Sequence, residues 1–211
     1  IDKDAFQKLF QNILSKQSET GAWDYIDANT ERNDMSISAW VCLGLNLLYT
    51  QMEFKKEAQN ALIKINKMLI RDKRGAGDNS VTTKAVGAYT YGEDPNATLG
   101  KILRSAGTTM QAIILFIKST LPEYRLSHWV ETAKTDQIKA LTSAPHFSLY
   151  QAFFVLLSQK NGVNFPAAWL LNTYQSLKKE QLDDGSWPLT SPPIQFGGKI
   201  MATAMGLTLL Q

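Results

Sequence analysis

Side chains that can bind a ligand or move a proton stand at or just before the starts of apolar helical segments. They supply an acid, two phenols, a hydroxyl, an imidazole and an amine, and they are Asp34, Tyr91, Thr109, His146, Tyr150 and Lys199. Ser36, Thr108 and Tyr89 occupy comparable positions. Together with the main-chain N–H groups of helix N-termini, such groups suit an anionic or hydroxylated ligand. These six residues are our candidate ligand-binding residues, and the sequence assigns no catalytic residue.

The remaining reactive side chains have structural interpretations. The chain has one cysteine, Cys42, which lies in an apolar segment, and two histidines, His128 and His146. A lone cysteine cannot form an internal disulfide, and these residues do not supply the ligands of a tetrahedral zinc site. The acidic pair at residues 183–184 precedes Gly185, where turn formation is the common role of aspartate. We expect no metal and no cofactor.

The composition is typical of one globular domain. The chain has 211 residues, of which 44% are hydrophobic and 19% charged, which excludes a disordered or fibrous protein. Its net charge of +3 is too small for a nucleic-acid footprint. No apolar run approaches the roughly 18 residues of a membrane span. We expect a single domain over residues 1–211, which can be part of a larger protein, with no nucleic-acid partner and no membrane span. Because the chain begins at Ile1 rather than Met, a processed periplasmic or secreted product is one option, and the compartment stays open.

Apolar periodicity predicts helices of two kinds. Residues 4–16, residues 54–70 and the segment after Asn164 carry one apolar face each. Residues 37–48, 110–117, 152–157 and 200–210 are apolar nearly all round, so they need cover on most sides. Pairing each one-faced helix with the apolar helix after it gives about four hairpins, over residues 4–50, 55–119, 125–159 and 165–211. The predicted class is all-α, with an inner and an outer helix layer, and residues 75–79 and 89–98 are predicted loops.

A short turn motif occurs twice. Gln17, Gly21 and Trp23 have the same spacing as a second set, Gln181, Gly185 and Trp187. Each set follows a one-faced helix and precedes an apolar helix with a similar hexapeptide, at residues 43–48 and 205–210. Repetition in the same order indicates stacked units that share a core. We expect the glutamine to satisfy N–H groups at a neighbouring helix start, the glycine to permit the turn and the indole to pack over the joint.

This repeat resembles that of squalene and oxidosqualene cyclases and related proteins of the prenyltransferase and squalene-oxidase repeat type, with their QW motif. Residues 34–40 after residues 21–25, and residues 197–199 with 203–204 after Trp187, are similar to an uncharacterised bacterial branch of that superfamily. The resemblance covers most of the chain. It implies a partial α/α toroid of the terpenoid-cyclase type, with inner and outer helices alternating around an axis and any ligand in the central cavity. In such a ring the inner helices start at one end, where Asp34, His146, Tyr150 and Lys199 would meet.

The chain lacks the motif residues of several chemistries found in this fold class. Cyclases that protonate an alkene carry D-x-D-D on a cavity wall, whereas the pair at residues 183–184 lies inside the turn motif. Protein prenyltransferases hold zinc with Asp, Cys and His, but neither histidine is near Cys42 in sequence. Lanthipeptide-type cyclases need two cysteines, and thioester-containing toroids need a G-C-G-E-Q run that is missing here. The resemblance therefore implies a fold without implying an activity.

Two functional interpretations follow. The favoured one is a toroid domain that binds a small molecule or a protein segment where the inner helices start. The alternative is an enzyme of the toroid class, either terpenoid-cyclase-like or a polysaccharide lyase or hydrolase that uses Tyr and His. The main aromatic residues of the inner helices are Trp40, Phe153 and Phe154, which are few for stabilising a carbocation. This favours binding over cyclisation.

Overall fold

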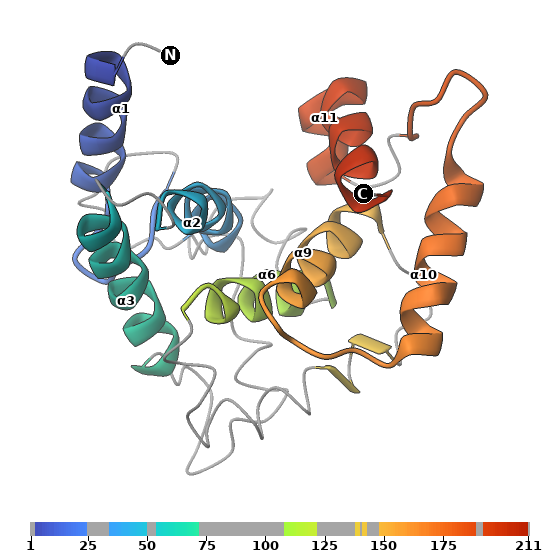
Figure 1. Cartoon of the computed structure of the whole chain (residues 1–211), viewed down its shortest axis with the longest axis horizontal. Coiled ribbons are helices and arrows are strands. Elements are labelled where there is room, and N and C mark those ends of the chain that lie inside the picture. The colour runs from blue at the N-terminus through green and yellow to red at the C-terminus, as the bar shows by residue number, and fades with distance from the viewer. Residues whose placement is uncertain are drawn as a thin grey trace, which may run out of the picture.

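The described part of the chain is helical. The structure, a computed structural model, describes residues 3–24, 34–49, 54–71, 108–121, 138–139, 141–142, 148–188 and 192–210. Within these ranges it has seven helices and no strand (Figure 1): α1 (Lys3–Ser15), α2 (Met35–Tyr49), α3 (Lys55–Arg71), α6 (Thr108–Ser119), α9 (Leu149–Lys160), α10 (Ala167–Glu180) and α11 (Pro192–Leu210). The predicted all-α class is confirmed.

Each predicted helical segment with described residues lies in one of these helices. The one-faced segments are α1, α3 and α10, and the apolar segments are α2, α6, α9 and α11. Helix α11 begins at Pro192, earlier than the predicted start at residue 200. Gly198 interrupts it with a φ of 71°, so the turns of the predicted segment follow this kink. The predicted outer helix at the start of the third hairpin and the loops at residues 75–79 and 89–98 lie outside the described residues.

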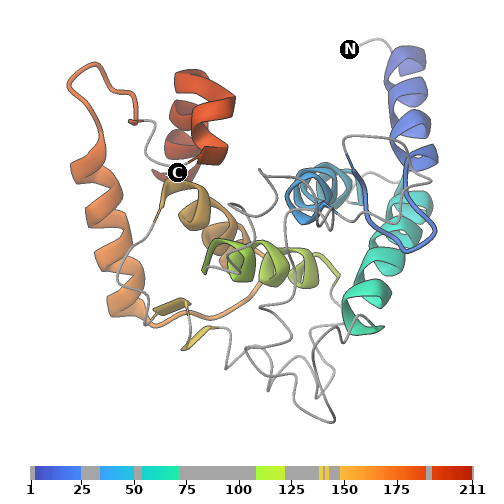
Figure 2. The same cartoon turned by 180° about the vertical axis from the view of Figure 1, so that it is seen from behind.

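The apolar helices form a continuous packed series. Helix α2 packs against α6, α6 against α9, and α9 against α11. Helix α3 packs against α2 and α6, and α10 packs against α11. Figures 1 and 2 show α1 and α10 at opposite edges of the molecule, with α2, α6 and α9 between them.

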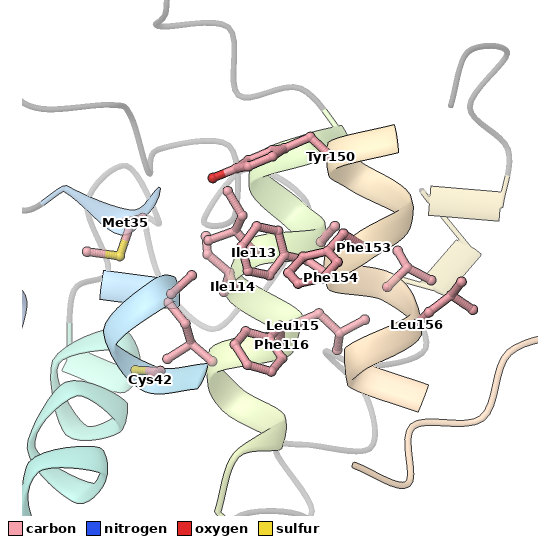
Figure 3. Close-up of a cluster of buried hydrophobic side chains, with 14 of the residues drawn as sticks. Met35, Cys42, Ile113, Ile114, Leu115, Phe116, Tyr150, Phe153, Phe154 and Leu156 are labelled. Atoms are coloured by element: carbon pink, nitrogen blue, oxygen red, sulfur yellow. The ribbon is translucent and has the colours of Figure 1, made fainter. Parts of the chain in front are cut away.

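The core lies where α2, α6 and α9 meet (Figure 3). It contains Ile113, Ile114 and Phe116 of α6 with Phe154 of α9, all of them buried. Burying one such side chain contributes about 1.5–3 kcal/mol to folding. Cys42 of α2 is a buried core residue, as the apolar surroundings in the sequence predict, and burial raises the pKa of its thiol.

The two middle helices are covered on nearly all sides, whereas the outer two apolar helices are not. All of residues 112–120 and 149–156 are buried. By contrast, α2 exposes Leu47, and α11 exposes Ile200 and Leu207. The expectation that every apolar segment is covered was therefore wrong for α2 and α11. The reason is their place in the series, since each packs against only one other apolar helix among those described.

Candidate functional site

The starts of α2 and α9 meet through their hydroxyl groups. Ser36 Oγ lies 2.6 Å from Tyr150 Oη, and both residues are buried. The indole Nε1 of Trp40 donates a second hydrogen bond to Tyr150 Oη, at 3.2 Å. In Figure 3 the Tyr150 hydroxyl points from α9 toward the side on which α2 lies. One phenol oxygen thus links α2 and α9.

Capping side chains fix the helix starts that carry these groups. Asp34 Oδ1 accepts a hydrogen bond from the Ile37 N–H at 2.9 Å, and Ser148 Oγ accepts one from the Gln151 N–H at 3.1 Å. Asp and Ser are favoured at this position because their oxygens satisfy otherwise unpaired N–H groups. The main chain of Asp34 also donates to the Trp23 carbonyl at 3.2 Å. These contacts connect the helix start to the first turn motif.

An aromatic cluster, consisting of Trp40, Tyr150, Phe153 and Phe154, surrounds the hydroxyl pair. The Trp40 ring stacks on Phe153 with centroids 5.3 Å apart and meets the edge of Phe154 at 5.7 Å. Phe153, Phe154 and Tyr150 are buried, but Trp40 is only half-buried. The buried rings of Phe153 and Phe154 therefore hold the indole in place, while part of it reaches solvent. A half-exposed aromatic ring of this kind can contact an apolar ligand.

The candidate residues named from the sequence are placed as follows. Asp34 caps α2 and Tyr150 joins that helix through Ser36, so these two belong to one site. Thr109 is half-buried in the first turn of α6. Lys199 is exposed, and its Nζ lies 2.6 Å from Asp184 Oδ2 in the second turn motif. The other two candidates, Tyr91 and His146, lie outside the described residues, as does His128.

The pair of Lys199 and Asp184 is electrostatically well matched but open to solvent. The Lys199 ammonium and the Ser186 hydroxyl hold the pKa of the Asp184 carboxyl well below its usual range. Both side chains are more than half exposed, so this pair contributes little to stability. Lys199 thus contacts the turn that precedes its helix, and it does not contribute to the site at the starts of α2 and α9.

Sequence reasoning missed a buried lysine at the C-terminal end of α6. Lys118 lies in the last turn of α6, and burial lowers its pKa to about 7. Near it, Asn66 Nδ2 donates to the Ile117 carbonyl at 3.4 Å and Asn161 Nδ2 donates to Ser119 Oγ at 3.1 Å. The only signal in the sequence was a lysine directly after an apolar run, which is also typical of an ordinary helix end. A lysine with such a pKa can exchange a proton near neutral pH.

The two turn motifs have the same internal hydrogen bonds. Gln17 Nε2 donates to the Gly21 carbonyl at 2.8 Å, and Gln181 Nε2 donates to the Gly185 carbonyl at 2.9 Å. The indole of Trp23 donates to the Ile13 carbonyl at 2.8 Å, and that of Trp187 to the Leu177 carbonyl at 2.9 Å. Both glycines have a positive φ, 112° and 81°. The repeat seen in the sequence is therefore a repeat in structure.

One predicted role within this motif was wrong. The glutamine does not accept from N–H groups at a helix start; its amide group donates to carbonyl oxygens, including the Ala61 carbonyl of α3 at 2.9 Å. The turn satisfies its own N–H groups, since the Ser18 N–H bonds to the Ala22 carbonyl and the Gly21 N–H to the Ser18 carbonyl. The carbonyls are what remain to be satisfied, and an amide donor serves them.

Other features of the described residues carry no further site. They contain no group of three or more His, Cys, Asp and Glu side chains that could hold a metal ion. In the same ranges no helix has the length and apolar character needed to cross a membrane. An open depression of about 400 Å³ lies on the surface of α1, lined by Asp4, Gln7, Lys8 and Gln11. It is formed by exposed residues of a single helix and is separate from the starts of α2 and α9.

Comparison with models of known protein families, with curated proteins and with solved structures finds no match. The turn motifs and the pair of hydroxyl groups are therefore interpreted from the structure of this chain.

Proposed function

We propose that this chain is a binding domain of the α/α-toroid type that takes an apolar ligand or protein segment where α2 and α9 start. The observation that carries the proposal is the half-exposed Trp40 ring, stacked on Phe153 and bonded to Tyr150 Oη. Residues from two hairpins build this surface, which is typical of binding sites and rare on a solvated face. The toroid arrangement is supported by the consecutive packing of α2, α6, α9 and α11, with α3 and α10 beside them.

The chemistry of the surface indicates the kind of ligand. Trp40 and the aromatic rings beneath it suit an apolar part of the ligand. The N-terminus of α9, capped by the neutral Ser148, favours a polar or anionic group, whereas Asp34 already places a carboxylate at the N-terminus of α2. A ligand that is apolar where it meets Trp40 and polar or anionic at its outer end satisfies both.

The hydroxyl groups of Ser36 and Tyr150 suit a binding role better than a catalytic one. Tyr150 Oη is buried and already engaged by Ser36 and Trp40. A catalytic phenol must reach the atom that reacts, and this one supports the neighbouring indole. No described contact favours the cyclase, lyase or hydrolase alternative.

A fluorescent probe tests the proposal. 1-Anilinonaphthalene-8-sulfonate combines an apolar ring system with one anionic group, so it matches the ligand class. Its affinity for the folded chain should fall at least about tenfold in Trp40→Leu, the loss of about 1.4 kcal/mol of aromatic contact. Trp169→Leu is the matched control, because Trp169 is also half-buried and its ring stacks on that of Phe165. It lies on α10, outside the proposed site.

Circular dichroism in the near ultraviolet must show that both variants keep their tertiary packing. Equal affinity of the probe for the Trp40→Leu and Trp169→Leu variants would contradict the proposed site. Binding of the probe only after tertiary packing is lost would contradict it as well.

A further inference from the structure

The two turn motifs differ in what lies against them. The first, residues 17–23, packs on α3: Gln17 Nε2 donates to the Ala61 carbonyl at 2.9 Å. A Cβ placed on Gly21 would lie 2.6 Å from the main-chain oxygen of Lys64. This glycine is therefore required by a close approach of the turn to the α3 backbone as well as by its positive φ.

In the second motif, residues 181–187, no helix of the described part of the chain covers the corresponding surface as α3 covers the first. Among the described residues, a Cβ on Gly185 would meet only the side chain of Gln181, at 4.0 Å. Leu182 occupies the position of Ser18, and it is 44% exposed where Ser18 is 6% exposed. The surface that α3 covers in the first motif is open in the second and carries a large apolar residue.

Helix α1 presents the opposite half of this joint. Its apolar residues Phe6, Leu9, Phe10 and Ile13 have the same spacing as Ala58, Ala61, Leu62 and Ile65 of α3. In this alignment Leu9 takes the place of Ala61, which the first motif covers. Leu9 is 56% exposed, whereas Ala61 is 5% exposed. Among the described residues, the side of the second motif that carries Leu182 therefore lacks the helix that α3 provides to the first motif, and Leu9 of α1 lacks the turn motif that covers Ala61.

Exposed apolar residues are confined to the two ends of the helical series. The large hydrophobic side chains exposed in the described ranges are Leu9, Leu47, Leu171, Leu182, Ile200 and Leu207. They lie on α1, α2, α10 with its turn motif, and α11, and none is among the described side chains of α3, α6 or α9. Stacked repeats with free ends need polar outer faces to remain soluble. Both ends of this series are apolar instead.

We propose that the second turn motif of one copy docks on α1 of a second copy, in a head-to-tail contact. Gln181 then donates to a main-chain carbonyl of α1 near Leu9, as Gln17 does to Ala61 within the chain, and Leu182 packs beside Leu9. The two surfaces are different and lie at opposite edges of the molecule (Figures 1 and 2), so the contact is heterologous. Such a contact extends a chain of copies or closes it into a ring. This inference is independent of the proposed ligand site.

The experiment uses charge substitutions in the middle of each surface. Sedimentation velocity of the unaltered chain should show association that grows with concentration. Leu9→Glu and Leu182→Glu should each weaken it at least about 30-fold, because each places a charge in an apolar contact. Leu47→Glu is the matched control, since Leu47 is also an exposed leucine, lies on α2 outside the proposed contact, and should associate as the unaltered chain does.

Mixing the two variants distinguishes a contact between α1 and the turn motif from one in which either surface meets its own copy. The Leu9→Glu copy keeps an intact turn motif and the Leu182→Glu copy keeps an intact α1, so an equimolar mixture should form a dimer that cannot grow. Three results would overturn the proposal. These are an unaltered chain that stays monomeric up to about 1 mM, single variants that associate normally, and a mixture that shows no dimer.

Discussion

The hydroxyl groups of Ser36 and Tyr150 lie 2.6 Å apart although the two residues stand 114 positions apart in the sequence. Each belongs to the first turn of an apolar helix, α2 or α9. The two helices therefore start at the same end of the packed series, and the Trp40 indole lies over the joint. This relationship places the candidate binding surface.

The hydroxyl pair should be energetically coupled. Tyr150→Phe removes a partner of both the Ser36 hydroxyl and the Trp40 N–H, and we expect it to lower the free energy of unfolding by about 1–3 kcal/mol. Ser36→Ala should cost less when Tyr150 is already Phe than when it is not, by about 1 kcal/mol. Urea unfolding of the four chains of this cycle measures the coupling. Strictly additive effects would show that the two hydroxyls do not depend on each other.

Trp187 should be essential for stability. It is fully buried, it donates to the Leu177 carbonyl, and its ring lies so close to Gly206 of α11 that a Cβ there would overlap it. We expect Trp187→Ala to cost about 3–5 kcal/mol, as measured by urea or thermal unfolding. Trp169→Ala, at a half-buried position on α10, should cost clearly less. An unchanged melting temperature in Trp187→Ala would contradict the role of the joint.

The two motif glycines should respond differently to alanine. In Gly185→Ala only the positive φ is strained, which costs about 1–2 kcal/mol. In Gly21→Ala the same kind of strain is joined by overlap with the Lys64 carbonyl of α3, so the loss should be larger. Denaturant unfolding of the two variants gives the comparison. Equal losses would mean that α3 does not lie against the first turn.

Because of Lys118, the free energy of unfolding should rise as the pH is raised above 7. Its pKa is lowered from 10.5 to about 7 in the folded chain, so between these values the unfolded chain binds more protons. Unfolding free energy then rises with pH over this window, by up to about 1.4 kcal/mol per pH unit from this group, and the effect vanishes below pH 7. Lys118→Met should remove that slope. A slope that is the same in both chains would show that the lysine titrates normally.

Much of the helical framework could be predicted from the sequence because its signals are local. The apolar spacing of α1, α3 and α10 and the continuous apolar runs of α6 and α9 depend only on which side chains must be buried. The turn motif was also visible, since Gln17, Gly21 and Trp23 recur with unchanged spacing as Gln181, Gly185 and Trp187. Its hydrogen bonds were harder to foresee, because the direction in which the glutamine donates depends on carbonyls left free by the turn.

The candidate site was only partly accessible to such reasoning. Asp34 and Tyr150 could be named because polar residues at helix starts are conspicuous in an apolar chain. The pairing of Lys199 with Asp184 could not be foreseen, because Lys199 directly follows a kink at Gly198 that has no signal in the apolar pattern. Lys118 was missed because a lysine at a helix end usually reaches water, and its burial results from the packing of α6 among helices far away in sequence.

In both turn motifs the indole donates a hydrogen bond to the helix that precedes the motif, α1 or α10. Hydrogen exchange at the indole nitrogens tests most directly whether these two hydrogen bonds are equivalent. The chain has five tryptophans, so a proton–nitrogen correlation spectrum has one indole signal for each, which Trp→Phe variants assign. After transfer to heavy water, the signals of Trp23 and Trp187 should persist together, because both indoles are buried and bonded to the carbonyls of Ile13 and Leu177. If either of these two signals disappeared as fast as that of a free indole while the chain remained folded, the two motifs would not be equivalent joints.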